Sequence, residues 1–133
     1  MNFKIKKGKG VRGEITIPGD KSISHRSIMC ASLAEGKSKI YGFLEGEDCL
    51  ATKIAFKDMG INFESNNDEI IVHGSGLYGL KKPKQEINLG NSGTSIRLLS
   101  GILSAQKFSS TLIGDESLSS RPMNRIIEPL SLM

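Results

Sequence analysis

Apolar and polar residues alternate in two short stretches near the start of the chain, residues 3–6 and 14–18. Alternation with a period of two is typical of β-strands, because successive side chains of a strand point to opposite faces. Three glycines lie between the two stretches and can form a turn. The pattern therefore predicts a pair of short strands within residues 1–18.

From residue 19 onward the pattern changes. Two segments repeat apolar residues with the period of 3.6 that is typical of a helix, and each is followed by a glycine that can end it. Asp48 lies where a residue would cap the second helix. Shorter apolar runs predict strands between and after the helices. We expect helices at residues 24–35 and 48–59, and strands at residues 39–44, 61–64 and 69–73.

The rest of the chain repeats the order of strand, helix, strand and helix. We expect strands at residues 87–89 and 110–113, a helix at residues 94–106, and a last helix that begins with Pro122. Arg26 and Arg97, both in predicted helices, lie 71 residues apart. The pattern predicts a first unit at residues 19–85 and an incomplete second unit at residues 86–133, without the two strands that close the first. We therefore expect the chain to be the N-terminal piece of a longer protein.

The composition is that of an ordinary globular domain, since 38% of the 133 residues are hydrophobic and 24% are charged. A net charge of +4 raises the question of nucleic-acid binding. The only dense basic run is residues 4–12, and aromatic residues that could stack on bases make up just 5% of the chain. We expect no nucleic-acid partner, and a modest positive charge suits small ligands that carry phosphates and carboxylates.

Membrane and metal binding are not expected. No apolar run approaches the ~18 residues of a membrane span, and the N-terminus lacks the apolar core of a secretion signal, so the sequence predicts a cytoplasmic protein. Cys30 and Cys49 are too far apart for a C-x-x-C pair, and we interpret both as reduced residues of the core. His25 and His73 are isolated from other potential ligands, so we predict no metal site.

Three short polar runs lead directly into predicted helices. The first N–H groups of a helix are unpaired, and the helix dipole adds positive charge there, so an anion is favoured at each entrance. Lysine and arginine side chains add full charges, and arginine can bind a carboxylate with two hydrogen bonds. The runs are GDKSISHRS, GNSGTSIR and GDESLSSRP, and their cations are Lys21, Arg26, Arg97 and Arg121.

A simpler interpretation is that serine and threonine in these runs only cap the helices, namely Ser22, Ser24, Ser92 and Thr94. Spacing alone leaves both interpretations open for any one run. Three cationic entrances in one short chain are better explained by a concave site for anionic ligands.

The three runs, extended as PGDKSISHRSIMCASLAEG, LGNSGTSIRLLSGIL and GDESLSSRPMNRIIEPL, resemble the N-terminal signatures of the 5-enolpyruvylshikimate-3-phosphate synthase family. The resemblance runs from about Val11 to Met133. It implies an α/β (α+β) fold in which βαβαββ units build an inside-out α/β barrel domain. Residues 1–18 would then be a crossover strand pair, and the C-terminal domain of the family is absent from this chain.

The resemblance also implies the roles of individual residues. Those that match the shikimate 3-phosphate site are Lys21, Ser22 and Arg26. Those that match the pocket for phosphoenolpyruvate and the inhibitor glyphosate are Lys21, Asn91, Gly93, Thr94 and Arg121. Lys21 is our candidate catalytic residue. Arg97 and His25 are expected to support the loops rather than to touch substrate, and Gly93 leaves room for glyphosate.

The activity implied by the resemblance is transfer of the enolpyruvyl group of phosphoenolpyruvate to the 5-hydroxyl of shikimate 3-phosphate, with release of phosphate, in chorismate and aromatic amino-acid biosynthesis. Neither a metal nor an organic cofactor is implied. We expect the chain alone to be inactive, because the family places its acid–base groups in segments that this chain lacks.

Two alternatives remain. One is a relative that transfers enolpyruvyl to UDP-N-acetylglucosamine, although such enzymes typically carry Asn after the Lys and lack the Ser22, His25 and Arg26 pattern. The other is a non-catalytic fragment that binds anions.

Overall fold

The computed structural model describes residues 2–8, 10–66 and 68–133. In chain order its elements are α1 (Lys21–Leu33), β1 (Glu35–Tyr41), α2 (Glu47–Asp58), β2 (Asn62–Asn66), β3 (Glu69–Ser75), β4 (Ile87–Asn88), α3 (Gly93–Ser104), β5 (Leu112–Ile113), α4 (Glu116–Ser119) and α5 (Asn124–Ser131). None of the helices in these ranges is long and apolar enough to cross a membrane.

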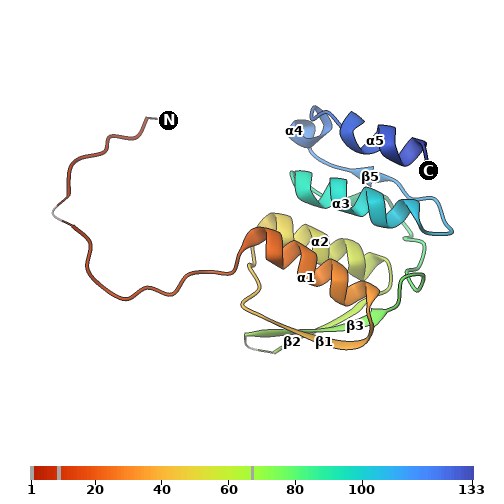
Figure 1. The fold of residues 1–133 in the computed structure, drawn as a ribbon, viewed down its shortest axis with the longest axis horizontal. Coiled ribbons are helices and arrows are strands. Elements are labelled where there is room, and N and C mark those ends of the chain that lie inside the picture. Colours follow the sequence, from red (N-terminus) through yellow and green to blue (C-terminus); the bar gives the residue numbers. More distant parts are fainter. Residues whose placement is uncertain (1, 9, 67) are drawn as a thin grey trace.

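Strands β1, β3 and β2 form an antiparallel sheet with β3 in the centre. Helices α1 and α2 cover one face of this sheet, and α3 lies on the other side of the two helices (Figure 1). Alternate residues of β3, Ile70 and Val72, are buried. The short strands β4 and β5 pair in parallel, and α5 packs on α3.

One continuous core joins the sheet to all three long helices. Its centre is formed by side chains from different elements that exclude water almost completely, such as Ile28 of α1, Phe56 of α2 and Leu99 of α3. Burying apolar surface in this way is the main driving force of folding, so the core brings α1, α2 and α3 together against the sheet.

Helix α1 approaches the sheet very closely at Gly74 of β3. A Cβ atom at this position would lie 2.2 Å from the carbonyl oxygen of Ala34 and 2.3 Å from that of Ala31. Only a residue without a side chain fits there. Across the sheet, Gly74 is paired with Gly36 of β1.

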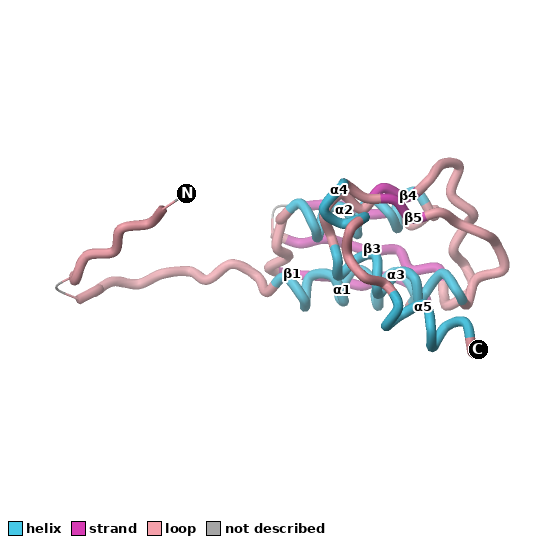
Figure 2. Tube along the Cα trace, turned by 90° about the horizontal axis from the view of Figure 1, so that it is seen from above, coloured by secondary structure: helices cyan, strands magenta, loops and turns pink. Residues whose placement is uncertain are grey.

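The strand pair predicted within residues 1–18 is wrong. The described part of this segment forms no strand and extends away from the rest of the chain (Figures 1 and 2). Its apolar side chains are 72–100% exposed, namely Phe3, Ile5, Val11, Ile15 and Ile17. A strand needs a neighbouring strand for its N–H and C=O groups and a surface for its apolar face, and within the described ranges this segment pairs with no strand and leaves its apolar side chains exposed.

Several predicted element ends are also wrong. Helix α1 begins earlier than expected, because the carboxylate of Asp20 accepts a hydrogen bond from the N–H of Ile23 (2.7 Å) and acts as the N-cap. Asp48 lies inside the first turn of α2, whose N-cap is Gly46. Pro122 precedes α5, which is capped by Met123, and the short helix α4 was not expected.

Four buried polar side chains connect the three long helices. His25 Nδ1 of α1 lies 2.8 Å from the hydroxyl oxygen of Thr52 of α2, which lies 2.7 Å from that of Ser95 of α3. The Ser95 hydroxyl also hydrogen-bonds that of Ser92, the N-cap of α3. All four residues are inaccessible to solvent. Groups buried in this way have no water to replace a lost partner, so their bonds fix the helices in one arrangement.

Replacing Thr52 should test this connection. Thr52→Val keeps the shape but leaves the buried polar groups of His25 and Ser95 without their partner, so we expect unfolding to become easier by about 1–3 kcal/mol. Thr52→Ser keeps the hydroxyl and should lose less. Urea unfolding of both variants measures the difference, and equal losses would show that the hydroxyl is unimportant.

His25 should make the fold sensitive to mild acid. Burial lowers the pKa of His25 below the ordinary 6.5; the nearby carboxylate of Asp48 opposes this effect, and the cation of Lys21 adds a smaller lowering. The neutral ring is therefore favoured in the folded state, and the unfolded chain takes up the proton first. The contribution of the neutral His25 ring to the free energy of unfolding should be fully present above pH 6.5 and should be lost as the pH falls below that value.

The measurement is the free energy of unfolding as a function of pH, for the wild type and for His25→Gln. The slope between about pH 7 and about pH 5 should be smaller in the variant. Equal slopes would contradict the assignment to His25.

Candidate functional site

The entrance of α1 presents the first group of candidate residues. Lys21 and Ser22 lie in the first turn, directly after the cap Asp20, and both are exposed. Arg26 lies one turn further and is also exposed, and it forms no ion pair with any described residue. This helix end therefore offers two cationic side chains and a hydroxyl to the solvent.

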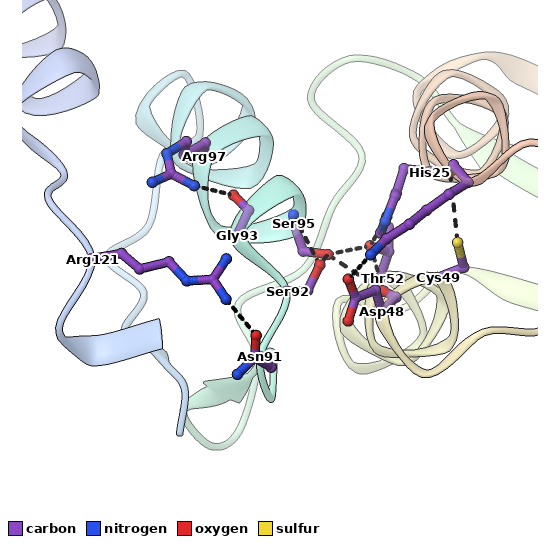
Figure 3. Close-up of polar contacts among 11 residues, drawn as sticks. His25, Asp48, Cys49, Thr52, Asn91, Ser92, Gly93, Ser95, Arg97 and Arg121 are labelled. Carbon is purple, nitrogen blue, oxygen red and sulfur yellow. Dashed lines mark hydrogen bonds and ion pairs between the residues drawn. The ribbon is translucent and has the colours of Figure 1, made fainter. Parts of the chain in front are cut away.

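Lys21 already has a partner. Its ammonium forms an ion pair with the carboxylate of Asp48, from the first turn of α2 (Figure 3). The Lys21 side chain is 53% exposed and that of Asp48 is 24% exposed, so the pair is accessible to a ligand. An anion that binds Lys21 must compete with Asp48 or share the lysine with it, since an ammonium has three donors.

The thiol of Cys49 holds the backbone of Lys21. Its sulfur lies 3.6 Å from the carbonyl oxygen of Lys21. Burial raises the pKa of the Cys49 thiol, so the thiol stays protonated and can donate. Cys49 is a buried core residue as expected, whereas Cys30 is exposed, contrary to expectation.

The entrance of α3 brings two guanidinium groups together above a glycine. A Cβ atom on Gly93 would lie 2.7 Å from Nη1 of Arg97 and 2.7 Å from Nη1 of Arg121. Figure 3 shows both arginines pointing toward the first turn of α3. The missing side chain of Gly93 thus allows two positive charges to lie at a helix N-terminus, where the dipole is positive as well.

The two arginines are held differently. Arg97 donates to the backbone carbonyls of Gly93 (3.0 Å) and Pro122 (3.4 Å) and so supports the loop, as expected. Arg121 donates to the side-chain oxygen of Asn91, whose amide group donates to Asp115. The guanidinium of Arg121 is therefore held by the exposed side chain of Asn91, whereas that of Arg97 is held by backbone carbonyls.

Asp115 is the acidic end of this arrangement. Its carboxylate caps α4 through the N–H of Leu118 (2.7 Å) and accepts from the Asn91 amide at 2.8 Å. These two hydrogen bonds, and further the charge of Arg121, hold the pKa of Asp115 below its usual range. The group is ionised at neutral pH.

The structure thus divides the predicted residues into two groups. Asn91, Gly93 and Arg121 meet at α3, with Thr94 half-buried in the same turn. The remaining candidates lie at α1, namely Lys21, Ser22 and Arg26. The buried side chains of His25, Thr52, Ser95 and Ser92 link the two helix ends. His25 was expected to order a loop, and instead it joins α1 to α2.

Several of these partners were missed. The ion-pairing role of Asp48 and the roles of Thr52 and Asp115 depend on contacts between distant segments that no local pattern signals. A weak signal existed for Ser95, because it follows Ser24 by the same 71 residues that separate Arg97 from Arg26. Both serines are buried in the first turns of their helices.

The site is open. The two largest cavities described, of about 600 and 520 Å³, lie between residues 16–19 and 42–45 and beside residues 75–79. Neither is lined by the candidate residues. Within the described ranges, no three His, Cys, Asp or Glu residues lie close enough together to hold a metal ion.

Comparisons with known proteins agree on one family. A family model described as EPSP synthase (3-phosphoshikimate 1-carboxyvinyltransferase) matches residues 5–133. The 3-phosphoshikimate 1-carboxyvinyltransferase of Ruthia magnifica subsp. Calyptogena magnifica is 61% identical over 131 residues, which cover 98% of this chain and 30% of that protein. The enzyme of the same name from Legionella pneumophila (strain Corby) is 57% identical over 134 residues, which cover 100% of this chain and 31% of that protein.

Solved structures show the same likeness. Two structures of EPSP synthase from Acinetobacter baumannii are similar with a TM-score of 0.87 at 60% sequence identity, over 91% of this chain and 27% or 28% of theirs. The expected α/β fold class is thereby confirmed. The chain spans about 30% of the length of the curated relatives it matches. The chain therefore belongs to the EPSP synthase family.

Proposed function

We propose that the protein containing this chain transfers the enolpyruvyl group of phosphoenolpyruvate to the 5-hydroxyl of shikimate 3-phosphate and releases phosphate. The observation that carries the proposal is the pair of guanidinium groups above Gly93 at the N-terminus of α3. A side chain at this position would collide with both groups, so the glycine creates room for concentrated positive charge. The relatives are named 3-phosphoshikimate 1-carboxyvinyltransferase, so the acceptor in that name is itself a phosphate-bearing anion.

Phosphoenolpyruvate is assigned to the α3 entrance. Asn91, Gly93, Thr94 and Arg121 are its proposed contacts, and the unpaired N–H groups of the first helical turn add to their attraction. Shikimate 3-phosphate is assigned to the α1 entrance, with Ser22 and Arg26 as contacts. Lys21 is proposed to contact both substrates. The buried link through Thr52 would keep the two substrates at a fixed separation, which lowers the entropic cost of their reaction.

In the proposed reaction, the methylene carbon of phosphoenolpyruvate gains a proton while the 5-hydroxyl attacks the adjacent carbon and loses its own. The resulting ketal carries the phosphate, which leaves as the methyl group gives back a proton. Cations placed in advance around these anionic species stabilise them without reorganising water. Lys21 is the proposed catalytic residue of this chain, by neutralising phosphoenolpyruvate or by assisting proton movement.

The chain alone is not proposed to be active. Its candidate residues lie on an open surface, and the reaction needs acid–base groups within hydrogen-bond distance. We propose that residues 19–85 form the αβαββ part of a first βαβαββ unit, since no described strand precedes α1, that residues 86–133 form part of a second, and that the rest of the enzyme closes the site. We further propose a cytoplasmic enzyme that uses no metal, nucleic acid or membrane, and that glyphosate binds at the phosphoenolpyruvate position.

The proposal can be tested with the full-length protein that contains this chain. Phosphate release from phosphoenolpyruvate should require shikimate 3-phosphate, and UDP-N-acetylglucosamine should not replace it. Lys21→Met should reduce kcat by roughly 100-fold or more, since charge stabilisation at a reacting centre is commonly of that size. The 133-residue chain should show no turnover.

The matched control is Lys39→Met, which removes another ion-paired lysine, the partner of Glu69 on the sheet. It should leave kcat unchanged. Release of phosphate without an acceptor, or an equal loss in both variants, would contradict the proposed function or the proposed role of Lys21.

Gly93→Ala should weaken phosphoenolpyruvate binding selectively. The new methyl group must displace both Arg97 and Arg121, because each Nη1 lies 2.7 Å from its position. Losing one charge-assisted contact corresponds to a rise in KM of roughly tenfold. Gly101→Ala is the control, since this exposed glycine of α3 has open space around it. Steady-state kinetics with both variants would decide, and an unchanged KM in Gly93→Ala would be contrary to the structure.

A further inference from the structure

Asp115 lies outside the entrances of α1 and α3, and it contacts Asn91 at the entrance of α3. The Asn91 amide donates through Nδ2 to the carboxylate of Asp115 at 2.8 Å, while its oxygen accepts from the guanidinium of Arg121. Asp115 thus contacts Asn91, and Asn91 contacts the arginine that lies above Gly93.

The direction of these hydrogen bonds is fixed by their ends. An ionised carboxylate can only accept, and a guanidinium can only donate. An amide between them has one favourable orientation, with its NH₂ toward Asp115 and its oxygen toward Arg121. In the reversed orientation the NH₂ of Asn91 would face the donors of Arg121, and its oxygen would face the carboxylate oxygen of Asp115. Neither pair can form a hydrogen bond.

Asp115 itself is held firmly. Its carboxylate accepts from the N–H of Leu118 at 2.7 Å, and its own N–H donates to the carbonyl of Gly90 at 2.9 Å. The side chain of Leu118 is buried, which anchors this loop in the core. The carboxylate is therefore a fixed reference point for the amide of Asn91.

We infer that Asp115 is a positioning residue for phosphoenolpyruvate: it orients the Asn91 amide so that Asn91 and Arg121 face the ligand at the α3 entrance. This inference rests on the proposed function. Asp115 touches no substrate itself. Its effect should appear in the affinity for phosphoenolpyruvate and not in that for shikimate 3-phosphate, whose proposed contacts lie at α1.

The test is Asp115→Asn in the full-length enzyme. Asparagine is as good an N-cap as aspartate, so the bond to the N–H of Leu118 can be kept. Its NH₂ group then faces the NH₂ of Asn91, and Asn91 can restore that bond only by turning its own NH₂ toward Arg121. We expect KM for phosphoenolpyruvate to rise about tenfold, as for the loss of one hydrogen bond to a charged group. KM for shikimate 3-phosphate should stay within a factor of two.

Glu116→Gln is the matched control. It removes one negative charge from the neighbouring position at the start of the same short helix, and no hydrogen bond joins its side chain to a described residue. It should leave both KM values unchanged. A comparable rise in Glu116→Gln would assign the effect to charge rather than to orientation and would overturn the inference.

Two further outcomes would also overturn it: an unchanged KM for phosphoenolpyruvate in Asp115→Asn, or an equal rise for both substrates, which a general disturbance of the fold would cause. If the wild type transfers no enolpyruvyl group, the proposed function fails, and calorimetric titration with phosphoenolpyruvate decides about Asp115 separately. If phosphoenolpyruvate binds tenfold more weakly to Asp115→Asn than to the wild type, the inference is supported. If it binds both proteins with equal affinity, or binds neither protein, the inference is rejected.

Discussion

The hydroxyl of Thr52 lies at the centre of the hydrogen bonds that fix the relative position of α1 and α3, and with it the position of both helix entrances. Through His25 it fixes α1, and through Ser95 it fixes α3, each near its N-terminal end. Apolar packing brings the helices together but is not directional, so it would tolerate small rotations. Hydrogen bonds inside a dry core do not tolerate such rotations of the helices, because each rotation would leave a buried polar group without a partner. The relative position of two exposed helix ends is thus set by four side chains that no ligand can reach.

Positive charge is concentrated at the two entrances, and the fold neutralises part of it locally. Lys21 is paired with Asp48, Arg97 with backbone carbonyls, and Arg121 with the oxygen of Asn91. These partners hold the cations in place in the absence of a ligand, which reduces the reorganisation required on binding. They are oxygen atoms at the edge of the site, so an anion can approach the same cations from the open side.

Much of the fold follows from local pattern, and most of the site's internal structure does not. The order of helices and strands from residue 21 onward was predicted, because periodicity reports which faces are buried. The strand pair near the N-terminus was wrong, since alternation indicates two faces but not whether a partner exists. The four-residue helix α4 was missed because it buries only Leu118 and has no period to detect.

The same limit applies to the functional residues. The helix entrances and their cations were recognisable from short runs. The structure brings Asn91, Gly93 and Arg121 together, and their role in binding phosphoenolpyruvate stays a proposal. Thr52 and Asp115 act through contacts to segments tens of residues away. A threonine inside a helix and an aspartate in a loop carry no distinctive sequence pattern. Only the folded chain shows that Thr52 contacts His25 and Ser95 and that Asp115 contacts Asn91.

Gly74 has a consequence for the alignment of the sheet. Strand β3 can lie against the end of α1 only where it has no side chain, so the helix selects which residue of the strand occupies that point. A slip of one residue would bring His73 or Ser75 against the carbonyls of α1 and would also turn Ile70 and Val72 away from the core. The position of β3 is therefore set by contact with a helix, and so is its pairing with β1, which follows α1 directly.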